Sequence, residues 1–290
     1  VMPGNIRIIP LGGVEEIGKN MTAIEIGNDI IVIDAGMQFA NEDTPGIDYI
    51  IPNTTYLEER KDKIRAMIVT HGHLDHIGGI PLVMSRIGNP TLYSRNLSIL
   101  MIQKRQSEFP HLPELKLVPV EKNQSITVGN IKVRFFGVTH TIPDSMGIII
   151  ETPYGNIVTP GDYKLDHIDG VATQSEEKEY AEFDNSNNLL LLTDSTNIEN
   201  EGFALPEIKV HQGLENLIRI STGRTIIAAF ASHITRLVKI VEIAEAFNKK
   251  VAIEGRSMKT NMEVVEAAGL FKYKKGTLIT IEEVDNYPPD

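Results

Sequence analysis

The chain has 290 residues, a formal net charge of −11 and no cysteine. With 41% apolar residues it can bury a sizeable core, either in one large domain or in two ordinary ones. The lack of cysteine excludes a disulfide framework, requires nitrogen and oxygen ligands for any bound metal, and fits a reducing compartment. No stretch approaches the roughly 18 apolar residues of a membrane span, so we expect a cytoplasmic protein with no membrane partner.

Short strands separated by turns are predicted from the N-terminus to about residue 202. Residues 6–10 form the first strand, and three antiparallel hairpins follow, each with glycine in its turn: 23–26 with 30–33, 125–128 with 131–135, and 147–151 with 156–158. Helices are predicted at 79–87 and 96–109. The polar, acidic stretch 174–188 predicts a surface loop, and the apolar run 189–192 predicts a strand in the middle of a sheet.

Strands and helices alternate after residue 202. A strand at 225–230, a helix at 234–247, a strand at 250–253 and a helix at 261–268 predict a βαβ arrangement with a parallel pair of strands. We therefore predict two domains, 1–202 and 203–290.

Positive charge is concentrated in this second region. Residues 221–275 contain ten lysines and arginines against five glutamates, although the whole chain is acidic. Two interpretations remain open for this basic segment: a solvated helical face, or a surface that attracts phosphates.

The most informative motif follows the apolar run 66–69. His71, His73, Asp75 and His76 supply three imidazoles and a carboxylate within six residues. These ligand types suit zinc or a similar divalent ion, and their number exceeds what one ion needs from one loop, which indicates two ions. A polar surface turn is the alternative, but such turns seldom place four ligands at this spacing.

Other polar residues also follow apolar strands. Asp34, His140, Asp162 and Asp194 each come at or just after the end of such a strand. A single aspartate at a strand end is usually a turn or cap residue. The repetition beside a ligand-rich loop predicts instead that these side chains converge on one site.

The HxHxDH motif at 71–76 resembles that of the metallo-β-lactamase superfamily, and His140 and Asp162 match its later ligands. A closer resemblance is to the ribonuclease J family, in the β-CASP branch that acts on nucleic acids. The segments that carry it are 11–13, 16–21, 71–79, 139–145, 161–164, 194–197, 230–232 and 255–258. The resemblance implies an α/β fold: an αββα metallo-β-lactamase sandwich with the first part of an inserted β-CASP domain.

The resemblance also implies a ligand set for two divalent metal ions, most simply Zn²⁺, with Mn²⁺ as the alternative. It assigns His71, His73 and His140 to one ion and Asp75 and His76 to the other, with Asp162 bridging them. A hydroxide activated by both ions would be the nucleophile, and Asp75, His76 and Asp162 would be the catalytic residues. By position, Asp34 and Asp194 would fix the orientation of the imidazoles.

The implied function is that of a metal-dependent ribonuclease that hydrolyses RNA from 5′ to 3′ and also internally, in RNA processing and decay, as a homo-oligomer. Possible contacts to RNA phosphates, for which capping and surface charge are the alternatives, are Ser232, His233, Arg236 and Arg256. For His233 we favour a cap of the helix that follows. Two competing functions are a thioester or lactone hydrolase of the same superfamily and a non-catalytic RNA-binding scaffold.

The sequence departs from the ribonuclease J pattern in three places. Leu74 stands where the family usually has glutamate, and His233 stands where it usually has asparagine. The family's later histidine motifs would follow Asp290, so we expect the chain to be part of a longer protein. The second ion would then lack one protein ligand here, and we expect the 290-residue chain alone to be weakly active or inactive.

Overall fold

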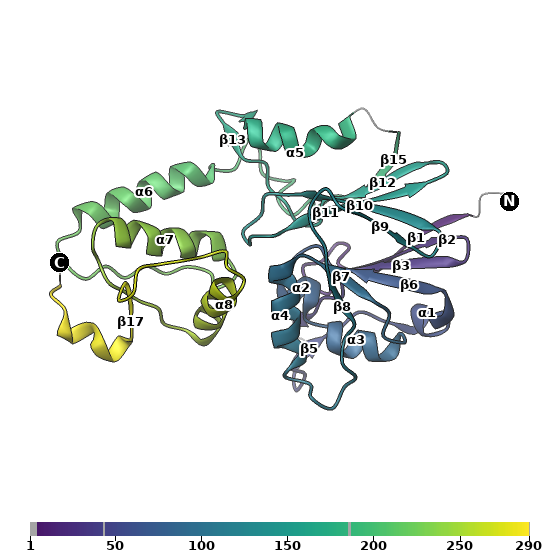
Figure 1. Cartoon of the computed structure of the whole chain (residues 1–290), viewed down its shortest axis with the longest axis horizontal. Helices are drawn as coiled ribbons and strands as arrows, with labels where there is room; N and C mark the ends of the chain where they lie inside the picture. The colour runs from purple at the N-terminus through teal and green to yellow at the C-terminus, as the bar shows by residue number, and fades with distance from the viewer. Residues whose placement is uncertain (1–4, 43, 185–186, 290) are drawn as a thin grey trace. The chain divides into compact units, whose positions relative to one another are not determined.

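The computed structural model describes residues 5–42, 44–184 and 187–289, which fall into two compact units (Figure 1). Unit 1 comprises Val1–Val138, Asp144–Lys164 and Glu177–Ser195, and unit 2 comprises Thr139–Pro143, Leu165–Glu176 and Thr196–Asp290. The domain boundary at 202/203 stays a prediction. None of the helices in the described part of the chain is long and apolar enough to cross a membrane.

Two sheets form the centre of unit 1. The first has six strands in the order β1 (Ile6–Gly12), β2 (Met21–Ile26), β3 (Asp29–Ile33), β6 (Ile64–Ile68), β7 (Leu92–Ser94) and β8 (Leu117–Pro119). The second has five, in the order β15 (Asn188–Leu191), β12 (Gly155–Thr159), β11 (Met146–Thr152), β10 (Ile131–Gly137) and β9 (Ser125–Val128). The three predicted hairpins are confirmed as the antiparallel pairs β2–β3, β9–β10 and β11–β12.

Helices cover the outer face of each sheet. Beside the first sheet lie the short elements β4 (Gln38–Phe39), β5 (Tyr49–Ile50), α1 (Thr55–Glu58), the 3₁₀ turn Lys61–Lys63, α2 (Leu74–Ile77), α3 (Ile80–Arg86) and α4 (Asn96–Gln106). Val83 and Met84 of α3 pack with Val32 and Met67 in one buried cluster. On the second sheet, Tyr180 of α5 (Gln174–Asp184) packs against the outward-facing cluster of β10–β12.

The two sheets pack face to face through a second core. Ile31 and Ile68 of the first sheet share this core with Phe135, Ile148 and Ile157 of the second, and all five side chains are buried. Removal of such apolar surface from water is the main stabilising term of the sandwich. The layer order helix, sheet, sheet, helix confirms the predicted αββα architecture (Figure 1).

Two sequence-based predictions for unit 1 are wrong. The strand at 189–192 is found as β15, but it lies at the edge of its sheet, with Leu189 and Leu191 50% and 56% exposed. Only Leu190 and Leu192 pack on the core, so a continuous apolar run does not place a strand centrally. The stretch predicted as a loop at 174–188 contains helix α5, whose polar composition reflects a largely solvent-facing helix rather than a lack of structure.

Unit 2 contains three long helices, α6 (Glu207–Ile220), α7 (Ile234–Ala246) and α8 (Arg256–Ala267), and short strand pairs. β13 (His167–Ile168) pairs with β14 (Val171–Ala172), and β16 (Val251–Ala252) pairs in parallel with β17 (Leu278–Ile279), which precedes the 3₁₀ turn Ile281–Asn286. The predicted strand at 225–230 is wrong: in the described part of the chain it joins no sheet, and Ile226 is 96% exposed. β-branched residues favour a strand only where a neighbour accepts their backbone hydrogen bonds.

One buried carboxylate joins the two sheets of unit 1. Asp29 of β3 accepts a hydrogen bond from Arg65 Nε, and its Oδ2 accepts two from Asn130, at 3.0 Å from the backbone nitrogen and 3.1 Å from Nδ2. Burial alone would raise the pKa of Asp29, but the hydrogen bonds and the charge of Arg65 lower it below its ordinary value of 3.8. The ionised carboxylate therefore stabilises the fold.

Replacement of Asp29 by alanine should reduce the free energy of unfolding by about 1–3 kcal/mol, because Arg65 and Asn130 lose hydrogen bonds to a buried, charged acceptor. Because the pKa of Asp29 is lowered in the folded protein, its ionised carboxylate makes its full contribution to stability above pH 3.8. This contribution is lost as the pH falls through the pKa of Asp29 in the folded state. Urea unfolding should therefore show a full difference between wild type and variant at neutral pH and a shrinking one below pH 3.8. The exposed Asp48→Ala is the control; an equal loss there would contradict the prediction.

Candidate metal centre

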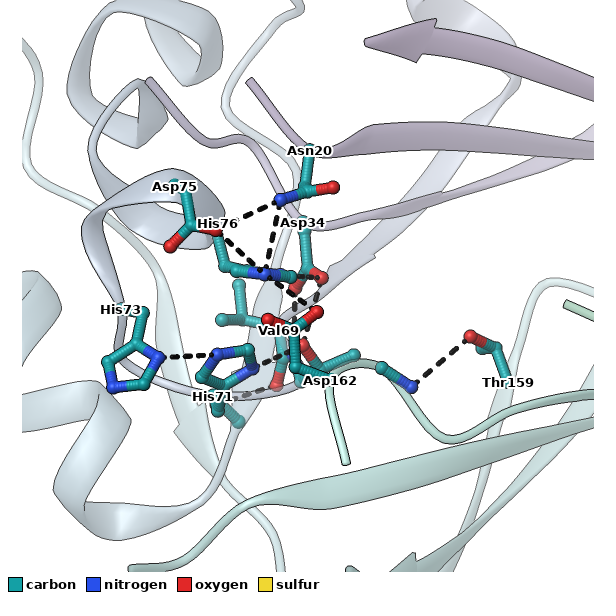
Figure 2. Close-up of polar contacts among 12 residues, drawn as sticks. Asn20, Asp34, Val69, His71, His73, Asp75, His76, Thr159 and Asp162 are labelled. Atoms are coloured by element: carbon teal, nitrogen blue, oxygen red, sulfur yellow. Dashed lines mark hydrogen bonds and ion pairs between the residues drawn. The ribbon is translucent and has the colours of Figure 1, made fainter. Parts of the chain in front are cut away.

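Strand ends from both sheets of unit 1 bring the predicted ligands together (Figure 2). β3 and β6 are parallel neighbours, so their carboxyl ends lie at one edge, and the Asp34 backbone N–H donates to Ile68 O at 3.0 Å. The chain leaves β6 through Thr70 and His71 and enters α2, whose first turn contains Asp75 and His76. Asp162 follows β12 of the facing sheet. The predicted convergence therefore holds for these residues.

Asp34 organises the buried side of this site. Its backbone is left-handed, with φ of 60°, which turns the chain sharply after β3. Oδ1 accepts a hydrogen bond from Thr70 N at 2.8 Å, while Oδ2 accepts from Thr70 Oγ1 at 2.9 Å and from His76 Nδ1 at 2.8 Å. Thr70 Oγ1 also lies 3.0 Å from His71 Nδ1. Both imidazoles are thus held through Nδ1, which leaves Nε2 of each for a ligand.

The distances between donor atoms fit a metal site. His71, His76 and Asp162 each offer one atom within 4.8 Å of the others. His76 Nε2 lies 3.2 Å from Asp162 Oδ1 and 3.4 Å from Asp75 Oδ2, and His71 Nε2 lies 3.0 Å from His73 Nδ1. Two atoms bound to one tetrahedral ion at about 2.1 Å are about 3.4 Å apart. A nitrogen- and oxygen-bound divalent ion therefore matches the arrangement of the residues present.

The electrostatics also favour a cation. Burial alone would lower the pKa of His76, but the Asp34 charge and hydrogen bonds to Asp162, Asp34 and Asp75 raise it well above 6.5. Burial alone would raise the pKa of Asp75, but the His76 hydrogen bond and the charges of His76 and His73 lower it. The carboxylates thus stabilise positive charge at His76, and a divalent ion would take the place of that proton.

Close backbone packing holds the histidine loop against the end of β3. Ala35 N–H donates to His76 O at 2.8 Å and Met37 N–H donates to Leu74 O at 3.0 Å. Between them, Gly36 leaves no room for a side chain, because a Cβ there would lie 1.5 Å from Asp75 O. Leu74, which replaces a glutamate of the family pattern, is 40% exposed.

The roles of His140 and Asp194 at this site stay predictions. His140 follows β10 in the segment Thr139–Pro143, which belongs to unit 2. Both ends of this loop are fixed in unit 1, where Val138 N–H donates to Ser145 O at 3.3 Å and Met146 N–H donates to Thr70 O at 3.0 Å. Asp194 is half-buried and follows Leu192, whose N–H donates to Val158 O at 2.8 Å.

The predicted phosphate contacts lie in unit 2. Arg236 is held by Glu207 through two hydrogen bonds of 2.9 and 3.0 Å. His233 stands at the N-cap position of α7, as predicted, and its carbonyl accepts hydrogen bonds from Arg236 N–H and Leu237 N–H, although its side chain makes no capping hydrogen bond. Its Nδ1 lies 3.2 Å from Thr235 Oγ1 instead. Ser232 and Arg256 are exposed, and contact of any of these residues with RNA stays a prediction.

Comparison with known proteins identifies the fold family. Residues 15–193, more than half of the chain, match the metallo-beta-lactamase superfamily. This chain belongs to the metallo-β-lactamase superfamily. Residues 222–290 match "Ribonuclease J, beta-CASP domain". A solved structure of a protein of unknown function from Enterococcus faecalis V583 shares the fold, with a TM-score of 0.67 at 17% identity over 98% of this chain and 76% of that one.

Within the superfamily, the chain is similar to curated proteins named ribonuclease J. Ribonuclease J of Mycoplasma genitalium is 34% identical over 282 residues, which are 97% of this chain and 49% of the relative. Ribonuclease J2 of Bacillus subtilis is 34% identical over 284 residues, 98% of this chain and 51% of the relative. The predicted resemblance to the ribonuclease J family is confirmed. The chain spans about half the length of the curated relatives it matches.

Two residues at this centre are absent from the set predicted from the sequence: Thr70, which contacts Asp34 and His71, and Asn20. Asn20, directly before β2, places Nδ2 3.2 Å from both Asp75 Oδ2 and His76 Nε2 (Figure 2). The only signal was its place in the segment 16–21, which resembles ribonuclease J but contains no ligand type that stands out by itself.

Proposed function

We propose that the protein is a metal-dependent ribonuclease that hydrolyses phosphodiester bonds of RNA. The observation that carries this proposal is the convergence of His71, His76 and Asp162 in a chain whose residues 222–290 match the ribonuclease J β-CASP domain. Relatives named ribonuclease J support RNA as the substrate. In the proposed ligand set His71, His73 and His140 would hold one ion, Asp75 and His76 would hold the other, and Asp162 would be shared between them.

Bound Zn²⁺ or Mn²⁺ ions would lower the pKa of a water molecule and neutralise charge on the phosphodiester. The protein's own residues supply orientation and proton transfer. Asp34 and Thr70 hold the two imidazoles through Nδ1. Asp75, whose pKa is lowered, is ionised at neutral pH and is the candidate to orient the attacking water or to accept its proton. Asp194 is proposed to orient an imidazole in the same manner as Asp34.

The finer parts of the proposal follow the ribonuclease J relatives. The protein would degrade RNA from 5′ to 3′ and cut it internally, act in the cytoplasm, and form a homo-oligomer. The basic segment 221–275 would attract RNA phosphates, with Ser232, His233, Arg236 and Arg256 as candidate contacts. Such a surface makes RNA affinity fall with rising salt.

A substrate panel tests the proposed function. The natural protein, loaded with Zn²⁺ or Mn²⁺, is incubated separately with 5′-monophosphorylated RNA, a thioester and a lactone, and products are followed by gel and by absorbance. We expect RNA cleavage and no turnover of the two small substrates. Hydrolysis of the thioester or lactone with intact RNA would show a small-molecule hydrolase instead, and RNA binding without any hydrolysis would show a non-catalytic scaffold.

A further inference from the structure

Asn20 contacts the predicted metal ligand Asp75 through both its main chain and its side chain. Its backbone N–H donates to Asp75 O at 2.9 Å, and its side-chain Nδ2 donates to Asp75 Oδ2 at 3.2 Å. These two hydrogen bonds close a ring between the residues. The ring fixes the Asp75 carboxylate relative to the main chain of Asp75, which one hydrogen bond would not do.

The main chain of Asn20 is itself anchored. Its carbonyl accepts a hydrogen bond of 2.9 Å from Gly36 N–H, and Gly36 is the residue that packs against Asp75 O without room for a Cβ. Figure 2 shows the Asn20 side chain directed at Asp75 and His76 on the side away from His71 and His73. The side-chain amide of Asn20 therefore reaches Asp75 and His76 from a main chain that is hydrogen-bonded at both its N–H and its carbonyl.

The loop that leads to Asn20 is strained. Glu15 and Lys19 have left-handed backbones, with φ of 57° and 52°. Each such residue costs about 1 kcal/mol or more, and strain of this kind persists where the surroundings hold it in place. A Cβ at Gly13 would lie 2.2 Å from Asn20 Oδ1. The β1–β2 loop thus adopts unfavourable backbone conformations directly before Asn20, which lies at the metal centre.

We propose that Asn20 is a positioning residue that holds Asp75 in the orientation in which it binds a divalent ion together with His76. A neutral amide suits this task, because it donates a hydrogen bond to the carboxylate without adding charge beside His76. The inference rests on the proposed metal centre, but it does not depend on RNA as the substrate.

Zinc titration of the natural protein and of Asn20→Ala and Asn20→Leu tests this inference. Both variants keep the main-chain hydrogen bonds, and leucine keeps the approximate size of the side chain. Competition with a chromophoric chelator should show one Zn²⁺-binding step weakened about 10- to 100-fold and any other step unchanged. The visible spectrum of the Co²⁺-loaded protein should change for the same step. Asn156→Ala, at a half-buried asparagine of β12, is the matched control and should bind as wild type does.

Two results would overturn the inference. Wild-type Zn²⁺ affinity and Co²⁺ spectrum in both Asn20 variants would show that the amide does not position Asp75. Equal weakening of every binding step together with a lower unfolding midpoint of the metal-free variants would show a merely structural role. A selective loss of one step supports the inference even if the natural protein cleaves no RNA, so it can stand or fail separately from the proposed function.

Discussion

Replacement of His76 by alanine should reduce RNA cleavage by the natural protein more than about 100-fold, because a ligand has a larger effect than the outer partners whose loss costs 10- to 100-fold. His76 Nε2 lies between Asp162 Oδ1 at 3.2 Å and Asp75 Oδ2 at 3.4 Å, so its loss removes the nitrogen from the centre of the ligand set. Single-turnover cleavage of 5′-monophosphorylated RNA at saturating Zn²⁺ measures the effect, and bound zinc per chain should fall by one ion.

The matched control is His111→Ala, which removes an exposed imidazole of the same unit. It should cleave RNA and bind zinc as wild type does. Cleavage by His76→Ala within a few-fold of the control would be incompatible with a catalytic metal centre at this position, whatever the zinc content.

Replacement of Asp34 by alanine should have the largest effect on stability. The carboxylate accepts three hydrogen bonds, two from Thr70 and one from His76, and is only 4% exposed. Its removal leaves the charged imidazole of the metal-free protein without its strongest partner, so we expect a loss of about 3–5 kcal/mol in the free energy of unfolding. Urea unfolding of the metal-free protein gives this value, and Zn²⁺ affinity should fall about 10- to 100-fold.

The variant Asp34→Asn separates the effect on the free energy of unfolding from the effect on Zn²⁺ affinity. Asparagine tolerates the left-handed backbone at φ of 60°, and its carbonyl can still accept one hydrogen bond, but it carries no charge to hold His76. We expect a smaller loss of stability than in Asp34→Ala with a similar loss of Zn²⁺ affinity. Unchanged metal affinity in both variants would show that Asp34 serves the fold alone.

The metal centre could be predicted because its chemistry is concentrated in a short motif at a strand end. His71, His73, Asp75 and His76 lie within one loop, and parallel pairing of β3 with β6 brings Asp34 to the same edge. Alternation of apolar residues and glycine turns likewise predicted the hairpins. Asn20 could not be predicted in this way, because its role depends on a loop whose course is set by left-handed residues and by close contact with Gly36.

The wrong predictions of secondary structure concern segments whose local sequence pattern does not reflect their tertiary contacts. The four leucines at 189–192 predict a central strand, but in the described part of the chain β15 lies at the sheet edge. Leu190 and Leu192 face the core, and Leu189 and Leu191 face the opposite side of the sheet, where they stay exposed. Residues 225–230 have strong β-propensity and no partner strand in the described part of the chain. The acidic helix α5 lacks a broad apolar face, so its periodicity was too weak to predict. Tertiary contacts decide such segments.

Metal removal and restoration test the central claim most directly. The natural protein is stripped with a chelator, 5′-monophosphorylated RNA is added, and cleavage is measured as Zn²⁺ or Mn²⁺ is returned. We predict no cleavage by the stripped protein and a return of activity that follows the bound metal and is complete at two ions per chain. RNA cleavage by fully metal-free protein, or restored metal without restored cleavage, would contradict a ribonuclease centred on His71, His76 and Asp162.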